Sequence, residues 1–285
     1  MVDVDGGEVR RIFDAGRTHL SFSQLQTYQS CGKKYELSYV QRVEREPQGA
    51  FLGGTAIHRA IQEAEGYGWW LDDANVSGPT APMVARFLEI LETKVAEAGG
   101  PGAIRWGGRG QGEDLAWWRK QGEFMCRRYV ATRQAMEASG WAPITHGVEM
   151  RVEATFDEVG EPIVGYLDKF LMHEEGEPLI VDYKSGKIGG AEPMQFATYA
   201  ALVKATRGID VERGVAVYLR APDAGRRVAP MRFADLTERM PRTFSVLARG
   251  IDAGLFEPNP SAFCKSCSVR AHCWYWQATE GKEEA

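Results

Sequence analysis

The stretch Ile180-Val181-Asp182-Tyr183-Lys184-Ser185-Gly186 decides the fold, because an apolar run ends there in an acid, an amine and a Ser-Gly turn. Side chains alternate along a β-strand, so Asp182 and Lys184 point to one face and Tyr183 to the other. Taken alone, this pattern is also typical of a salt bridge at a strand end. It predicts a strand that carries both charged groups at the edge of a sheet.

Periodicity predicts alternating helices and strands around this stretch. Helices are expected over 24–39, from Thr55 onward, and over 83–98, 113–139, 192–206 and 236–253; strands are expected over 146–156, 162–173, 179–184, 211–220 and 227–233. Gly53-Gly54 is expected to break the chain before the second helix. The first three strands form an antiparallel meander. The fold class is therefore α/β.

The middle strand of the meander supplies a second carboxylate. Asp168 stands in a run otherwise suited to burial, and antiparallel pairing can bring it near Asp182. Two neighbouring carboxylates repel each other and are costly to desolvate. A divalent cation between them removes that cost, and oxygen ligands of this kind suit Mg²⁺ or Mn²⁺.

Four further residues fall where such a site could use them. His58 lies one turn into the second helix, and Glu149 lies on the first strand of the meander. Gln195 and Tyr199 are spaced i, i+4 and share one helical face. Each also has an ordinary structural explanation, as a surface or core residue, but their order along the chain favours a common site.

Cysteines form a second pattern. The spacing Cys264-x-x-Cys267 with Cys273 places three thiols in a short irregular segment, and Cys31 is the obvious fourth ligand. Cys126, on a predicted helix, is expected to be a buried small apolar residue. The spacing alone fits either zinc or an iron–sulfur cluster. The neighbouring aromatic residues could stack on single-stranded bases or pack around this site.

The motifs, in order, resemble those of the PD-(D/E)XK nuclease superfamily, most closely its RecB-like branch, which includes CRISPR-associated RecB-family exonucleases and the nuclease domain of AddB. They are Gly54-Thr55-x-x-His58, Gly165-x-x-Asp168, Asp182-Tyr183-Lys184-Ser185-Gly186 and Gln195-x-x-x-Tyr199. The resemblance runs from about Ser21 to Trp276. Ser185 stands where many relatives carry Thr, and no motif falls within residues 66–140.

The resemblance implies a restriction-endonuclease-like core, with a central mixed β-sheet flanked by helices, and a role for each site residue. It implies metal ligation by His58, Asp168, Asp182 and the backbone carbonyl of Tyr183. Lys184 would orient or activate the attacking water, Gln195 and Tyr199 would position the substrate backbone or Lys184, and Glu149 would serve in a second shell or a second metal site. It also implies a [4Fe–4S] cluster held by Cys31, Cys264, Cys267 and Cys273.

The expected domain organisation follows from these assignments. We expect a flexible N-terminus over 1–17, a nuclease domain over 18–277 with a helical insertion at about 66–140 and the cysteine clamp, and a flexible tail over 278–285. The chain of 285 residues is 44% hydrophobic and 26% charged, as in soluble globular proteins. No apolar run could span a membrane, and no secretory signal precedes the first helix, so a cytoplasmic location is expected.

The expected function is that of a Mg²⁺- or Mn²⁺-dependent DNA exonuclease. It would hydrolyse phosphodiester bonds of single-stranded DNA or DNA ends in recombination, repair or CRISPR adaptation, with protein partners from those pathways. The first alternative is a non-catalytic DNA-binding or adaptor subunit of a larger complex. The second is a zinc-stabilised binding module.

Overall fold

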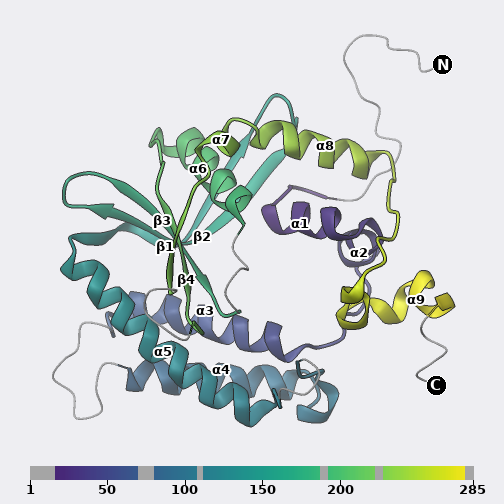
Figure 1. Cartoon of the computed structure of the whole chain (residues 1–285), viewed down its shortest axis with the longest axis horizontal. Helices are drawn as coiled ribbons and strands as arrows, with labels where there is room; N and C mark the ends of the chain where they lie inside the picture. Colours follow the sequence, from purple (N-terminus) through teal and green to yellow (C-terminus); the bar gives the residue numbers. More distant parts are fainter. Residues whose placement is uncertain (1–16, 70–79, 108–111, 187–191, 222–226, 280–285) are drawn as a thin grey trace. The chain divides into compact units, whose positions relative to one another are not determined.

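The structure is a computed structural model that describes residues 17–69, 80–107, 112–186, 192–221 and 227–279 (Figure 1). The chain forms two compact units, each built from separated segments. The first unit comprises residues 1–45, 155–163 and 241–285, and the second comprises residues 46–154 and 164–240. The flexible ends predicted over 1–17 and 278–285 fall almost wholly outside the described residues. No described helix is both long enough and apolar enough to cross a bilayer.

The second unit is centred on a mixed sheet of five strands (Figure 1). In spatial order they are β1 (Trp141–Thr155), β2 (Pro162–His173), β3 (Pro178–Lys184), β4 (Gly214–Tyr218) and β5 (Val228–Met231). Strand β3 is antiparallel to β2 and parallel to β4, because a helix crosses over between β3 and β4. This confirms the predicted α/β class with a central mixed sheet. Strand β1 begins at Trp141, earlier than predicted.

Three helices cover one face of this sheet (Figure 1): α3 (Gly49–Tyr67), α4 (Ala81–Glu97) and α5 (Leu115–Ala138). Their buried apolar side chains form one core with residues of the strands. On the sheet side this core contains Leu171, Leu179, Val181, Tyr183 and Val217. The predicted helices over 83–98 and 113–139 therefore match α4 and α5, and residues 101–103 add a short 3-10 turn.

Helix α6 (Pro193–Arg207) lies against the opposite face of β3. Asp182 stands between Val181 and Tyr183, which belong to the core under α3–α5, so strand alternation turns Asp182 away from that core. Gln195 of α6 donates a hydrogen bond of 3.0 Å to Asp182. The two faces of β3 thus separate an apolar core from a polar site.

Helix α3 runs without interruption through Gly53 and Gly54, so the predicted chain break is wrong. Glycine weakens an isolated helix. Here, however, the ring of Trp118 occupies the space beside Gly53, where an added Cβ would lie 2.1 Å from it. Gly49 makes room for Trp106 in the same way. Close packing of aromatic rings against the glycines therefore accounts for them inside a helix.

The first unit begins with α1 (Phe22–Ser30), α2 (Gly32–Tyr35) and a π-helical turn (Glu36–Val40). The single helix predicted over 24–39 is thus interrupted at Cys31, whose backbone is extended with φ −169° and ψ 115°. Gly32 packs against the backbone of Phe256 and Glu257, where an added Cβ would lie 3.0 Å away. This contact with a distant segment accounts for the interruption.

Three further helices and two short turns complete the description. The helix predicted over 236–253 is divided into α7 (Ala234–Thr237), in the second unit, and α8 (Met240–Asp252). The C-terminal part of the first unit consists of 3-10 turns over Ala262–Ser266 and Arg270–His272 and of α9 (Trp274–Thr279). Cys264 lies in the first of these turns, and Cys267 and Cys273 directly follow the first and the second turn.

Candidate functional site

Asp168 and Asp182 lie where β2 and β3 stop pairing. The antiparallel register ends at Lys169↔Val181, and its next step would place Asp168 opposite Asp182. At that point the side chain of Asp168, rather than the backbone of β2, accepts a hydrogen bond from β3. Its Oδ2 accepts a hydrogen bond of 2.6 Å from the backbone N–H of Tyr183. The structure therefore brings both carboxylates to the same end of the sheet.

Helix α3 brings His58 to this end of the sheet. Its Nδ1 lies 3.2 Å from Oδ1 of Asp168. Glu149 of β1 joins them: one ligand atom from each of His58, Glu149 and Asp168 lies within 4.8 Å of the others. Gly54 lies one turn before His58 and close to Ser185. A Cβ added at Gly54 would lie 3.1 Å from Oγ of Ser185. The glycine therefore allows α3 to approach the turn after β3.

Glu149 reaches this group through an unusual backbone conformation. Its φ is 46°, in the left-handed region that residues other than glycine rarely adopt. Within a strand, such a residue locally disrupts the pleat and redirects a side chain, and it is typical of functional sites. The sequence predicted only a regular strand here. The role expected for Glu149 was in a second shell or a second metal site, and the sequence did not indicate the backbone conformation that brings it beside His58 and Asp168.

Lys184 and Asp182 form a second group beside the first. Nζ of Lys184 lies 2.7 Å from Oδ2 of Asp182. Gln195 contacts both of them, since its Oε1 accepts from Lys184 at 2.9 Å and its Nε2 donates to Oδ1 of Asp182 at 3.0 Å. The same Nε2 lies 3.0 Å from the hydroxyl of Tyr199. These four residues therefore form one continuous hydrogen-bonded network.

The site carries an excess of negative charge. Burial, followed by the nearby Asp168, raises the pKa of Glu149 to about 7. Burial and Asp168 also raise the pKa of Asp182 to about 6, although Lys184 opposes this shift. Burial alone would lower the pKa of His58, but the three carboxylates outweigh it and raise that pKa to about 9. A bound divalent cation would relieve this repulsion.

The environment of one buried oxygen atom bears on whether these residues fit a metal ion. Oδ2 of Asp182 is buried and, among the described residues, has no hydrogen bond of good geometry, although Lys184 lies close to it. Buried acceptors are almost always satisfied. The carboxylates of Asp168 and Glu149 and the imidazole of His58, whose ligand atoms lie within 4.8 Å of one another, form a donor set rich in hard oxygen ligands, and Asp182 is not part of that group. Such a set fits Mg²⁺ or Mn²⁺.

An open pocket of about 550 Å³ gives access to His58, Glu149 and Asp168. Its remaining walls include side chains that the sequence did not single out as site residues: Phe51, Arg59, Gln62 and Tyr166. The sequence did contain an indication for one of them, Phe51. Phe51 precedes His58 by seven positions, or two helical turns, so the two residues share a face of α3.

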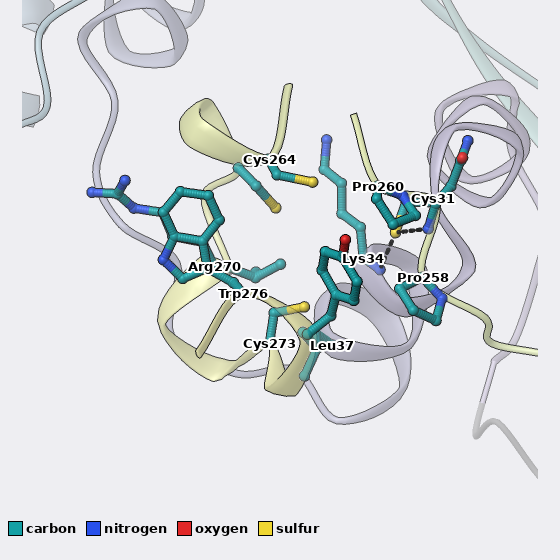
Figure 2. A pocket seen from close by; sticks show the side chains of 13 residues that line it. Cys31, Lys34, Leu37, Pro258, Pro260, Cys264, Arg270, Cys273 and Trp276 are labelled. Carbon is teal, nitrogen blue, oxygen red and sulfur yellow. Dashed lines mark hydrogen bonds between the residues drawn. The ribbon is translucent and has the colours of Figure 1, made fainter. Parts of the chain in front are cut away.

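The first unit contains a second candidate site, where four thiols line one pocket (Figure 2). They belong to Cys31, Cys264, Cys267 and Cys273. Sγ of Cys31 accepts backbone hydrogen bonds from Lys34 at 3.5 Å and from Asn259 at 3.4 Å. Sγ of Cys264 accepts one from Ser261 at 3.4 Å. These backbone N–H groups point at the sulfur atoms of the pocket.

The spacing of these thiols bears on what they could bind. Four Zn–S bonds of about 2.3 Å in a tetrahedron place the sulfur atoms about 3.8 Å apart. Among the described residues, which include all four cysteines, no three of these sulfur atoms lie within 4.8 Å of one another. Binding of one zinc ion would therefore require some of these thiols to move closer together. Cys126 lies elsewhere, buried in the core under α3–α5 as predicted.

A mixed sheet with a helix-borne histidine, an aspartate and an Asp-x-Lys strand at one end defines a nuclease core. The sequence profile of the PD-(D/E)XK nuclease superfamily matches residues 19–274, and the chain belongs to this superfamily. The match confirms the resemblance at the level of the superfamily, with metal-dependent nuclease activity as the activity it indicates.

Other comparisons are more distant. No curated protein sequence matches the chain. Among solved structures, the chain is similar to the crystal structure of SSO0001, with 16% identity over 89% of this chain and 95% of that chain and a TM-score of 0.36. It is also similar to the crystal structure of protein VC1899 from Vibrio cholerae, with 13% identity and a TM-score of 0.24 over 83% of this chain. The match spans 57% of the VC1899 chain.

Proposed function

We propose that the chain is a Mg²⁺- or Mn²⁺-dependent exonuclease that hydrolyses phosphodiester bonds of single-stranded DNA or DNA ends. The observation that carries this proposal is the convergence of His58, Glu149 and Asp168 beside the Asp182–Lys184 pair. Membership of the superfamily supports the class of reaction. The RecB-like resemblance of the motifs supports recombination, repair or CRISPR adaptation as the setting, with protein partners from those pathways.

The proposed metal ligands are His58, Asp168, Asp182 and the backbone carbonyl of Tyr183, with Glu149 as a further ligand or part of a second metal site. When bound, a divalent ion lowers the pKa of a coordinated water and polarises the phosphoryl oxygen. Asp168 is already oriented for this role, because the Tyr183 N–H holds one of its oxygens and His58 lies beside the other.

Lys184 is the proposed partner of the attacking water and of the scissile phosphate. Its ammonium group can hold a water in line with the phosphorus or stabilise the charge that develops on the phosphate. Gln195 and Tyr199 position it: Gln195 bonds to the amine and to Asp182, and lies against the Tyr199 hydroxyl. The amine is thus held at the metal site from two sides rather than left free to rotate.

The second part of the proposal is a [4Fe–4S] cluster bound by Cys31, Cys264, Cys267 and Cys273. The RecB-like resemblance supports the cluster over zinc, and all four thiols line one pocket, as a shared cofactor requires. The cluster would stabilise the first unit by tying α1 and α2 to the C-terminal turns. We accordingly propose one nuclease domain over 18–277, with a helical insertion at about 66–140 that includes α4 and α5.

Digestion of DNA labelled at one end tests the nuclease assignment. The wild type is incubated with single- or double-stranded DNA and either Mg²⁺ or Mn²⁺, beside Asp182→Asn and the exposed control Glu97→Gln. We expect progressive shortening by the wild type and the control, none by Asp182→Asn, and none in EDTA. DNA binding without cleavage by the wild type, in either metal, would instead identify a DNA-binding or adaptor subunit.

A further inference from the structure

Two exposed aromatic side chains stand in the wall of the candidate catalytic pocket. Phe51, in the first turn of α3, is 70% exposed, and Tyr166, two residues before Asp168 on β2, is 54% exposed. Both line the pocket that contains His58 and Glu149. The two rings thus place exposed aromatic surface beside the polar groups of this pocket.

The positions of the two rings follow from their elements. Phe51 lies two turns before His58, roughly 10 Å along the helix axis at 1.5 Å per residue. Tyr166 lies roughly 7 Å before Asp168 along its strand. Each ring is therefore within about two nucleotides of the proposed metal.

The other polar groups of the pocket suit a nucleic-acid strand. Arg59 shares the pocket, and its guanidinium is held by Glu63 at 3.0 Å and Gln62 at 2.6 Å, so a fixed cation faces the solvent there. Aromatic rings beside a cation form the usual platform for single strands, where bases stack and phosphates pair with charge. Bases within a duplex are already stacked on one another and cannot use such rings.

We propose that Phe51 and Tyr166 stack on unpaired bases next to the scissile phosphate and thereby make the site selective for single-stranded over duplex DNA. This inference rests on the proposed function for the identity of the pocket. It adds the two residues that would select the substrate. It also says which part of the nucleotide they would contact: the face of the base, not its hydrogen-bonding edge.

The test measures binding, so that it is independent of cleavage. Full-length protein carrying Asp182→Asn, with Mg²⁺, is titrated against a fluorescent single-stranded oligonucleotide and against its duplex. Adding Phe51→Ala or Tyr166→Ala should weaken single-strand binding about 5- to 150-fold each and leave duplex binding unchanged. Phe51→Trp and Tyr166→Phe keep a ring and should restore affinity. Tyr67→Ala removes a ring that is 72% exposed at the other end of α3, outside the pocket, and is the matched control.

A second readout reports stacking directly. An oligonucleotide containing 2-aminopurine should lose fluorescence on binding to the Asp182→Asn protein and keep it on binding to the Phe51→Ala, Tyr166→Ala double variant. Single-strand affinity within two-fold of the parent in the folded double variant would overturn the proposal, as would equal losses for single strand and duplex. Failure of the proposed function would look different: the wild type would bind DNA and never shorten it.

Discussion

Glu65 of α3 and Lys169 of β2 form an ion pair that is almost completely removed from solvent, with side-chain exposures of 2% and 0%. Nε of Arg133 lies 3.4 Å from the same carboxylate, and the hydroxyl of Tyr129 donates to it. Glu65 follows His58 by two helical turns, and Lys169 follows Asp168 directly. The buried pair therefore fixes α3 against β2 and, with it, the 3.2 Å approach of His58 to Asp168.

Breaking this pair should be costly. Glu65→Gln leaves the buried ammonium of Lys169 without its counter-charge, and we expect a loss of about 3–5 kcal/mol in the free energy of unfolding. Urea titration of the purified variant measures it. The matched control is Lys94→Met, which breaks an exposed pair with Glu97 and should cost at most about 1 kcal/mol. Equal losses for the two variants would contradict the structural role given to Glu65.

Substitutions of Asp168 and Lys184 should distinguish metal binding from hydrolysis. Asp168→Ala should abolish both Mn²⁺ binding, measured by calorimetry, and DNA cleavage. Lys184→Ala should still bind Mn²⁺ but lose at least about 100-fold in cleavage rate, because the amine that orients the water and stabilises developing charge is gone. Cleavage at the wild-type rate by Lys184→Ala would show that the lysine has been given the wrong role.

The left-handed backbone of Glu149 can be tested by comparing two substitutions. Both Glu149→Gly and Glu149→Ala remove the carboxylate, so both should weaken Mn²⁺ binding equally. Only glycine adopts φ 46° without strain, and Glu149→Gly should therefore be more stable than Glu149→Ala by about 1–2 kcal/mol. Thermal unfolding in EDTA provides the comparison. If alanine is as stable as glycine, the backbone of residue 149 does not hold this conformation.

The pKa shifts at the site predict opposite pH dependences with and without metal. The pKa of Glu149 is raised from 4.5 to about 7 and that of His58 from 6.5 to about 9. Each protonated form is therefore favoured by folding, and the metal-free protein should lose stability as pH rises between about 5 and 9. Mn²⁺ must displace these protons, so its affinity should rise over the same range.

Melting temperatures in EDTA and calorimetric titrations with Mn²⁺, both between about pH 5 and pH 8, check these slopes. Glu149→Gln does not titrate, and its melting temperature should fall less with pH than that of the wild type. A wild-type protein whose stability in EDTA rises with pH through this interval would disprove the charge balance described for the site.

The cysteine site makes a prediction that needs no DNA. Protein purified without oxygen should be brown and contain iron and acid-labile sulfide, and Cys31→Ser should lose the colour and unfold at a lower temperature. Cys126→Ala, in the core of the other unit, should keep the full iron content. Colourless protein with one zinc ion per chain would replace the cluster by a zinc site and would require the thiols to move closer together.

Much of the sheet could be predicted because its signals are local. Strand alternation alone placed Asp182 and Lys184 on one face, and the structure has them 2.7 Å apart. The i, i+4 spacing likewise placed Gln195 and Tyr199 side by side, where they are hydrogen-bonded. The α/β class and the order of the first three strands followed from the same periodicities and turn residues, whereas the mixed sheet was expected only from the family resemblance.

What the sequence could not provide depends on contacts between distant residues. Gly53 was taken for a helix breaker because its partner, Trp118, lies on another helix. The burial of Lys169 is explained only by Glu65, and the position of Glu149 only by a backbone conformation that its neighbours do not encode. In each case a local rule was overridden by packing.

The order in which the cysteines occur has a consequence for biosynthesis. Asn259, whose N–H donates to Sγ of Cys31, lies 228 positions after it. During synthesis, every residue of the proposed catalytic network, from His58 to Tyr199, is therefore made before Asn259, the distant residue that contacts Cys31. Insertion of the proposed cluster would then have to follow the synthesis of Cys273, and a chain stalled short of Cys273 would hold the whole proposed catalytic set with an incomplete cysteine site.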